Sequence, residues 1–166
     1  MPIELRPATA DDVLALAALW HTGWHDGHAG HVPDELLPFR TPESFVPRTA
    51  GRIERATVAV RDGELAGFTV VDGEEVEQVY VAAAHRGTGV AATLLTDAEQ
   101  QVAGAGHGTA WLAVAPGNTR ARRFYERQGW SDGGGFTYVA EAGATTMEVP
   151  ARRYVKSLGT PDGLRP

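Results

Sequence analysis

The sequence predicts a domain of the mixed α/β (α+β) class, in which an antiparallel meander precedes two strand-to-helix units. Two Asp-Gly turns join three β segments, residues 57–60, 65–71 and 75–81, into that meander. A glycine-bearing loop then leads from the third segment into an apolar helical stripe. A further strand and helix follow over residues 109–129, so strands and helices alternate after the meander.

The N-terminal elements are a short strand over residues 3–6 and a helix that begins near Asp11. Thr9 and Asp12 have approximately the spacing of a capping box, which marks a helix start. The apolar side chains that follow share one helical stripe: Val13, Leu16, Ala17, Trp20 and Trp24. We expect this stripe to face the core.

Residues 23–47 interrupt the helical pattern with glycines, histidines and prolines. We expect an adaptable segment there, with a short helix that opens at Thr41.

The later elements are punctuated by glycine and asparagine. Residues 91–102 carry an apolar helical stripe that ends at the glycines of residues 104–106. Asn118 opens the next helix and Gly129 ends it. Further strands are predicted over residues 109–114, 136–140 and 145–149.

The length of 166 residues fits one domain, since most domains contain about 100–150 residues. Hydrophobic residues make up 43% and charged residues 22%, which is typical of ordinary globular domains. We expect one domain over residues 1–156 and a frayed tail over residues 157–166.

Charge and cysteine content exclude several classes of function. The formal net charge of −6 has the wrong sign for affinity gained by neutralising nucleic-acid phosphates. The chain has no cysteine, which excludes disulfides, thiolate metal sites and a cysteine nucleophile. No apolar run approaches the roughly 20 residues that span a bilayer, and no signal-peptide pattern opens the chain. We therefore expect a cytoplasmic protein with no nucleic-acid or membrane partner.

Residues 86–91, Arg-Gly-Thr-Gly-Val-Ala, form a loop where a strand passes into a helix. Free N–H groups and the positive end of the helix dipole favour an anion there. Gly87 and Gly89 let the backbone approach a diphosphate closely and tolerate positive φ. The alternative is that these glycines only form a tight turn.

Two other nucleotide-binding motifs fit this loop poorly. The spacing Gly87-x-Gly89-x-x-Ala92 matches the loose dinucleotide fingerprint, but it follows an antiparallel meander, and no acidic residue ends the next strand to hold a ribose. A P-loop is excluded because no Lys-Ser or Lys-Thr pair follows the glycines. The loop therefore indicates a different diphosphate ligand.

Two motifs closely resemble those of the GNAT acetyltransferase superfamily. The first is R-x-x-G-x-A at residues 86–91, and the second is N-x-x-A-x-x-F-Y-x-x-x-G-W at residues 118–130. Two motifs in the right order are more specific than either alone. The resemblance covers most of the chain and is weakest over residues 23–55 and after Ser131, where such enzymes place acceptor-binding elements.

The resemblance implies the GNAT fold, a central mixed, mostly antiparallel sheet of six to seven strands flanked by about four helices. It also implies acetyl-CoA as cosubstrate, and N-acetyl transfer to a primary amine on a small molecule or peptide. Because no cysteine can form an acyl-enzyme, we expect direct attack in a ternary complex, without a metal. The excess of acidic over basic residues favours a cationic acceptor, because a negatively charged protein attracts cations as they approach it. A homodimer is common in the family.

The resemblance assigns coenzyme binding to the loop and to the strand before it. Backbone N–H groups around Val79 and Val81 would pair with the pantetheine arm and stabilise an oxyanion, although both valines equally suit a core. The expected coenzyme-binding residues are Val79, Val81, Arg86, Gly87, Thr88, Gly89, Val90, Ala91 and Asn118. Asn118 can combine this role with capping its helix.

Two carboxylates are candidates for taking the proton from the acceptor ammonium. Glu75 and Glu77 lie two residues apart, so they project to the same face of a strand. Glu75 precedes Arg86 by eleven residues, where GNAT enzymes that use a strand glutamate carry it. We expect Glu75 as the base and Glu77 as the next candidate. The alternatives are water alone as the base, or two solvated carboxylates without a role.

Tyr125 matches the tyrosine that the family uses as general acid toward the leaving thiolate. It lies four residues after Ala121 on a helix, so the alternative is an aromatic side chain packed on the sheet.

Four of the six histidines, His21, His25, His28 and His31, lie within eleven residues. A metal site is one interpretation, but the HExxH pattern is missing, and the intervening glycines argue against one continuous helix that presents all four. By resemblance, Trp24 and His25 are expected to line the acceptor cleft.

The main alternative function is a catalytically inactive module that binds or senses acyl-CoA. The presence of both Glu75 and Tyr125 argues against it. Such a module would be stabilised by coenzyme without turning over any amine.

Overall fold

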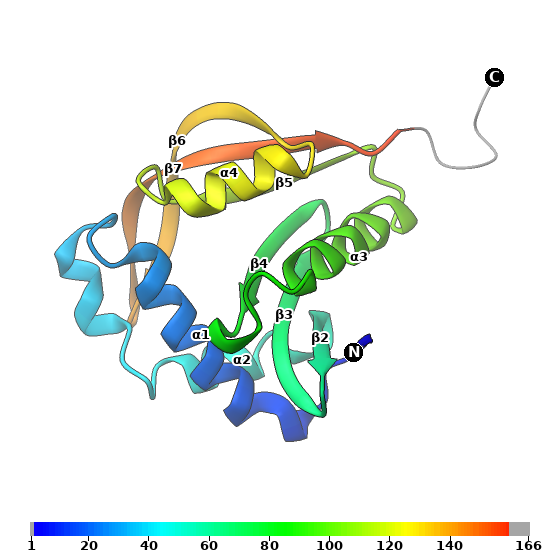
Figure 1. Ribbon diagram of the computed structural model, residues 1–166. Coiled ribbons are helices and arrows are strands. Elements are labelled where there is room, and N and C mark those ends of the chain that lie inside the picture. Colours follow the sequence, from blue (N-terminus) through cyan, green and yellow to red (C-terminus); the bar gives the residue numbers. More distant parts are fainter. Residues whose placement is uncertain (1, 160–166) are drawn as a thin grey trace.

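A computed structural model describes residues 2–159 and shows a seven-stranded sheet with the order β1-β2-β3-β4-β5-β7-β6 (Figure 1). The strands are β1 Ile3–Pro7, β2 Ala56–Arg61, β3 Glu64–Asp72, β4 Glu75–Val81, β5 Thr109–Val114, β6 Ser131–Ala142 and β7 Thr145–Ser157. All neighbours are antiparallel except β4 and β5, which are parallel. The predicted mixed, mostly antiparallel sheet and its meander are confirmed.

Four α-helices and four short 3-10 helices surround the sheet within residues 2–159. The α-helices are α1 Val13–His28, α2 Phe45–Ala50, α3 Val90–Gly104 and α4 Thr119–Arg127. The 3-10 helices are η1 Ala10–Asp12, η2 Asp34–Phe39, η3 Ile53–Arg55 and η4 Ala83–His85. Among these described helices, none has the length and apolar character needed to cross a membrane.

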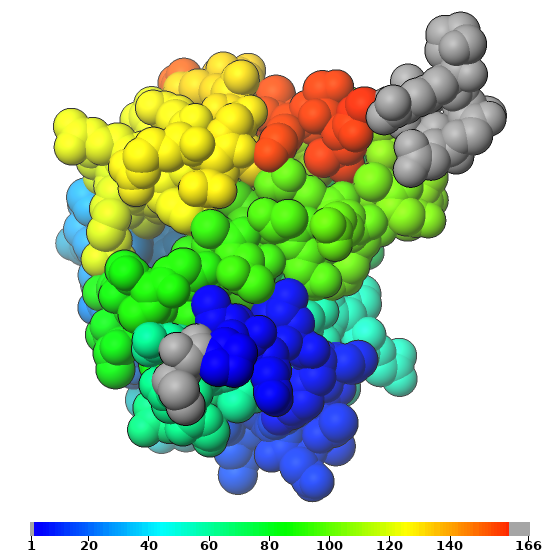
Figure 2. Space-filling model, turned by 45° about the vertical axis from the view of Figure 1, so that its right-hand side comes forward, coloured from blue at the N-terminus to red at the C-terminus, as the bar shows by residue number. Residues whose placement is uncertain are grey.

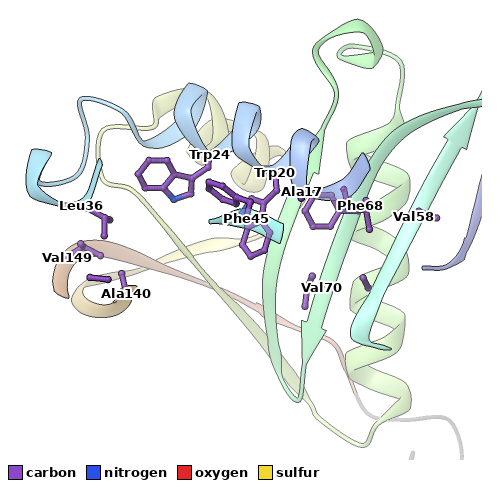
Figure 3. Packing of buried hydrophobic residues seen from close by; sticks show 13 residues of the cluster. Ala17, Trp20, Trp24, Leu36, Phe45, Val58, Phe68, Val70, Ala140 and Val149 are labelled. Atoms are coloured by element: carbon purple, nitrogen blue, oxygen red, sulfur yellow. The ribbon is translucent and has the colours of Figure 1, made fainter. Parts of the chain in front are cut away.

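The helices cover both faces of the sheet. On one face, α1 and α2 bury Trp20 and Phe45 against Phe68 of β3, with ring centroids 5.3 and 6.1 Å from that of Trp20. Figure 3 shows this cluster continuing past Trp24 to the β6–β7 hairpin. On the other face, α3 and α4 bury a second cluster that includes Leu95 and Tyr125. Figure 2 shows α3 crossing that face between the N-terminal strand and α4.

Strands β4 and β5 diverge almost from their first contact. Their register contains a single pair, Glu75 with Trp111, and the Trp111 N–H donates to the Glu74 carbonyl at 3.0 Å. Beyond this point the sheet splits into a β1–β4 half and a β5–β7 half (Figure 1). Among residues 2–159, the split leaves the edge of β4 beyond Glu75 without a strand partner on the β5 side.

Helix α1 continues through Gly23 and Gly27 to His28, so the predicted break of the helix at Gly23 is wrong. Both glycines lie where other elements approach closely. A Cβ on Gly23 would lie 2.4 Å from Cδ1 of Tyr80, and one on Gly27 would lie 3.0 Å from Nδ2 of Asn118. These glycines therefore let α1 pack against β4 and the start of α4, which offsets their poor helix propensity.

The short helix expected to open at Thr41 begins instead at Phe45, after a turn in which the Ser44 N–H donates to the Thr41 carbonyl at 3.1 Å.

The hairpin of β6 and β7 is longer than predicted from the sequence. β7 lies between β5 and β6, so partners on both sides extend it well beyond the expected residues 145–149. Its last residue, Ser157, pairs with Thr109, and the Leu158 N–H donates to the Gly108 carbonyl at 2.9 Å. The expected frayed tail therefore does not begin at Ser157, and its remainder over residues 160–166 lies outside the described residues.

Candidate active site

A cavity of about 490 Å³ opens where β4 and β5 diverge. Its walls come from β4, β5, the start of α3, α4, the C-terminal end of α1, the segment between η2 and η3, and the β6–β7 hairpin. Most of the residues that the sequence predicts for the site line it: Trp24, Glu77, Val79, Val81, Arg86, Gly87, Gly89, Ala91, Asn118 and Tyr125. The other predicted residues, Glu75, Thr88, Val90 and His25, are absent from its lining.

Residues 86–91, which we call the phosphate loop, join η4 to α3. Gly87 has φ of 74° and Gly89, the N-cap of α3, has φ of 88°, both in the left-handed region that favours glycine. The Thr88 hydroxyl donates to the His85 carbonyl and fixes the turn, while Val90 is buried beneath it at 1% exposure. The loop therefore presents backbone at the start of α3, where unpaired N–H groups attract anions.

The phosphate loop is also tied to α1. Nη2 of Arg86 lies 3.0 Å from Oδ2 of Asp26, and both side chains are partly exposed. This ion pair connects the C-terminal part of α1 to the loop.

The free edge of β4 supplies a second row of backbone groups. In an antiparallel pair, the N–H and C=O groups of one residue point to the same side of the strand, and those of the next residue point to the opposite side. The Ala82 N–H donates to the Ala66 carbonyl beside β3 at 2.8 Å, so by alternation the N–H groups of Val79 and Val81 face β5. With β5 diverging, these groups border the cavity and are able to pair with an extended ligand.

Helix α4 closes the cavity from the β5 side. Asn118 caps the helix, since its Oδ1 accepts from the Ala121 N–H at 3.2 Å. Tyr125 lies about two turns after Asn118, within an aromatic group that includes Trp130 and Tyr154. Burial raises the pKa of Tyr125 to about 12, so its hydroxyl stays protonated over the physiological range.

The two strand glutamates occupy different environments. Two consecutive residues of β3, Val71 and Val70, pair with Val76 and Gln78 of β4. Glu77 therefore has no partner of its own in β3 and is the extra residue of a β-bulge. The Glu77 carboxylate lines the cavity and pairs with Nε of Arg52.

Glu75 lies outside the cavity lining but is half buried. Burial, followed by the negative charges of Glu77 and Asp72, raises the pKa of Glu75 to about 7. The hydroxyl of Tyr138, which does line the cavity, interacts with this carboxylate and opposes the rise.

Two of the four histidines, His21 and His25, contact each other with ring centroids 4.6 Å apart, and the other two make separate contacts. Nε2 of His25 donates to the Arg40 carbonyl at 2.9 Å, so its ring is engaged away from the cavity lining. His28 stacks on Trp24 with ring centroids 5.0 Å apart, and burial lowers its pKa to about 4. His31 follows the helix and packs against Gly117. Within residues 2–159, no three His, Asp or Glu side chains lie close enough together to hold a metal.

Several lining residues were not predicted from the sequence. They come from the segment before η3, from β4 and from the β6–β7 hairpin: Arg40, Arg48, Arg52, Tyr80, Tyr138 and Glu141. The ring of Tyr80 packs on Gly23, and burial raises its pKa. We call Arg40, Arg48 and Arg52 the arginine cluster. No motif marks these residues, because the fold alone brings them to the cavity.

Comparison with solved structures shows the same fold over at least 95% of the chain. The GCN5-related N-acetyltransferase from Rhodopseudomonas palustris is 19% identical with a TM-score of 0.73, and the match covers 95% of this chain and 96% of that chain. YncA from Salmonella typhimurium, solved with acetyl-CoA, is 16% identical with a TM-score of 0.71, over 97% and 98% of the two chains. The PaiA N-acetyltransferase from Thermoplasma acidophilum, in complex with coenzyme A, is 19% identical with a TM-score of 0.65, over 95% and 99%.

A search of curated proteins gave no match. The sequence itself matches the Acetyltransferase (GNAT) family over residues 17–130, a span that contains the phosphate loop, the bulged strand β4 and both motifs. With its split sheet and its cavity between β4 and β5, the chain belongs to the GNAT acetyltransferase family.

Proposed function

We propose that the protein transfers the acetyl group of acetyl-CoA to a primary amine by direct attack within a ternary complex. The observation that carries this proposal is one continuous cavity, which runs from the phosphate loop along the free edge of β4 to Glu77 and Tyr125. The absence of cysteine supports direct attack, because no cysteine acyl-enzyme can form.

Backbone groups hold the coenzyme in this proposal. The N–H groups of the phosphate loop bind the diphosphate, with Arg86 and the N-terminal end of α3 adding positive potential. The pantetheine arm pairs with β4 through Val79 and Val81, as an added strand would. Solved structures of YncA with acetyl-CoA and PaiA with coenzyme A have the same fold, which supports this placement.

Glu75 is the proposed terminal acceptor of the ammonium proton. A carboxylate whose pKa is raised to about 7 is ionised in part of the population at neutral pH, and it is a stronger base than an ordinary one. Since Glu75 is outside the cavity lining, the proton reaches it through a water molecule or the Tyr138 hydroxyl. Glu77 has a different role, holding Arg52 by its ion pair.

The acetyl carbonyl and the leaving sulfur need donors as the amine attacks. A cavity-facing N–H of β4, at Val79 or Val81, stabilises the charge that develops on the carbonyl oxygen. Tyr125 donates a hydrogen bond to the leaving sulfur. Its pKa of about 12 exceeds that of a thiol, near 8.5, so a hydrogen bond is favoured over complete transfer of its proton.

Release of coenzyme A thiol from acetyl-CoA, measured over a panel of amines, tests the proposal. Turnover with at least one amine is expected, with strong losses in Glu75→Gln and Tyr125→Phe. Undiminished turnover in both variants would contradict the residue roles but not the activity. Coenzyme-dependent thermal stabilisation with no turnover of any amine would instead identify a binding or sensor module.

A further inference from the structure

The arginine cluster carries more positive charge than the carboxylates around it can pair. Arg52 takes both nearby acids: Nε donates to Glu77, and Nη2 donates to Oε1 of Glu141 at 2.9 Å. Within residues 2–159, Arg40 and Arg48 form no ion pair with a carboxylate. Two guanidinium groups therefore line the cavity without a counter-ion of their own.

Arg40 is buried and Arg48 is partly buried, and within residues 2–159 both guanidinium groups have nitrogen atoms without a hydrogen-bond partner. Arg40 is 3% exposed, and its Nη1 donates to the Phe39 carbonyl at 3.2 Å. Nε of Arg40, together with Nε and Nη1 of Arg48, is buried without a hydrogen-bond partner among the described residues. An uncompensated buried charge strongly opposes folding, so its presence in a cavity indicates that a ligand supplies the missing partner.

Aromatic faces hold these groups in place. The Arg48 guanidinium lies over the Trp20 ring, 4.4 Å from its centroid, and 5.0 Å from that of Phe45. Arg40 lies 5.4 Å from the Trp24 centroid. Stacking fixes the planes of the guanidinium groups without neutralising their charge, which is how arginine is prepared to bind a carboxylate or phosphate.

We propose that Arg40 and Arg48 bind an anionic group of the acceptor, so that the acceptor is a small zwitterion carrying a carboxylate or a phosphonate beside its amine. This inference rests on the proposed acetyl transfer at the same cavity. It replaces the cationic acceptor expected from the net charge of −6, because the cavity is lined by more arginine than carboxylate side chains. A cavity of about 490 Å³, shared with the coenzyme arm, suits a small molecule.

The other titratable groups near Arg40 and Arg48 do not neutralise these two arginines. Glu141 is the carboxylate that acts on both Arg40 and Arg48, but it is 56% exposed and already bonded to Arg52. His28 is neutral at pH 7 since burial lowers its pKa to about 4, and Tyr80 keeps its proton because burial raises its pKa.

Matched pairs of acceptors test the inference: an amino acid, its decarboxylated amine and its aminophosphonate analogue. We expect kcat/KM for the amino acid or aminophosphonate to exceed that for the decarboxylated amine by about 100-fold, which corresponds to two charge-assisted hydrogen bonds. The better of the two anions then identifies the acceptor subclass. Equal kcat/KM values across the set would overturn the inference while leaving acetyl transfer intact.

Variants separate an acceptor role from a structural one. In Arg48→Gln and Arg40→Gln, KM for the anionic acceptor should rise about tenfold or more, with unchanged kcat/KM for the decarboxylated amine and unchanged Kd for coenzyme A. Arg61→Gln on β2, which does not line the cavity, is the control and should change none of these values. An equal loss for all acceptors, or a weaker Kd for coenzyme A, would contradict acceptor binding.

Two further measurements do not depend on turnover. Arg48→Met removes an unpaired buried charge, so we expect the Tm of the free protein to rise; a fall would show that Arg48 is structural. With coenzyme A bound, the anionic acceptor should raise the Tm of the wild type but not that of Arg48→Met. If that shift appears while no amine is acetylated, the proposed activity fails and the anion site stands. If neither the Tm shift nor acetylation of an amine is observed, both the anion site and the proposed activity fail.

Discussion

The phosphate loop and the arginine cluster line one cavity but are constructed in different ways. The loop offers main-chain N–H groups, held in place by two left-handed glycines and the start of α3. The cluster offers long side chains from a segment with little regular structure, held by aromatic rings and by Glu77 and Glu141. A backbone site depends on conformation and tolerates change in most side chains, whereas a side-chain site can change its ligand by substitution.

This difference matches the two substrates of an acetyltransferase. In the proposed reaction, the site made of backbone groups binds the coenzyme. The arginine cluster, the proposed acceptor site, lies within residues 23–55, where the resemblance to the family is weakest. The predictions below test whether the two regions separate in function as they do in construction.

The largest effect is expected at Tyr125, which lines the cavity that the two regions share. Tyr125→Phe removes the proposed donor to the leaving sulfur and should lower kcat on the order of 100- to 1,000-fold, with little change in either Kd. Steady-state kinetics and calorimetric titration measure this split. The control is Tyr154→Phe, because the Tyr154 hydroxyl donates to Glu126 at 2.6 Å outside the cavity. That variant should lose stability and keep kcat.

Glu75→Gln should lower kcat/KM about 100-fold at pH 8 and change its dependence on pH. In the wild type, kcat/KM should rise as pH increases through about 7, because the carboxylate must lose its proton before it can accept another. The glutamine variant should lack this step. A step that persists with the same apparent pKa would assign the titration to another group and remove Glu75 from the reaction.

Gly89→Ala tests the backbone region alone. A side chain at φ of 88° costs about 1–2 kcal/mol, which the loop can avoid only by leaving the conformation that binds the diphosphate. We expect KM for acetyl-CoA to rise about tenfold, with KM for the acceptor unchanged. Gly104→Ala, at the end of α3 with no positive φ and open space around it, is the matched control and should leave both KM values unchanged. Equal changes in both variants would contradict the assignment of the loop.

The smallest effect on activity is expected from Gly23→Ala, which tests how α1 joins the two regions. Its Cβ would lie 2.4 Å from the Tyr80 ring, so the variant should lose roughly 1–3 kcal/mol of stability despite better helix propensity. Gly27→Ala meets only the end of the Asn118 side chain at 3.0 Å and should lose less. Thermal unfolding measures both; an increase in Tm for Gly23→Ala would show that this close contact is unnecessary.

The backbone region could be predicted from sequence because its requirements are local. Positive φ requires glycine at fixed positions, and a helix start requires a cap, so Gly89 and Asn118 were identified by spacing. Burial of Tyr125 could also be expected from its helical spacing. The same local reasoning misplaced the end of α1, because Gly23 and Gly27 have a tertiary role as points of close approach.

The arginine cluster could not be predicted, because long-range contacts assemble it. Arg52 meets Glu141 across 89 residues of sequence, and no local pattern signals such a pair. The net charge of the whole chain could not predict this cluster for the same reason, since it says nothing about which charges line the cavity. The contrast between Glu75 and Glu77 likewise depends on a bulge and on Arg52, not on their shared strand.

Amide hydrogen exchange in the presence and absence of coenzyme A tests the central claim most directly. If the coenzyme is bound by backbone groups, saturating coenzyme A should slow exchange at Val79, at Val81 and over residues 87–91, and leave residues 40–52 unchanged. Slowed exchange confined to residues 40–52, or no change at the phosphate loop and β4, would contradict this account of the site.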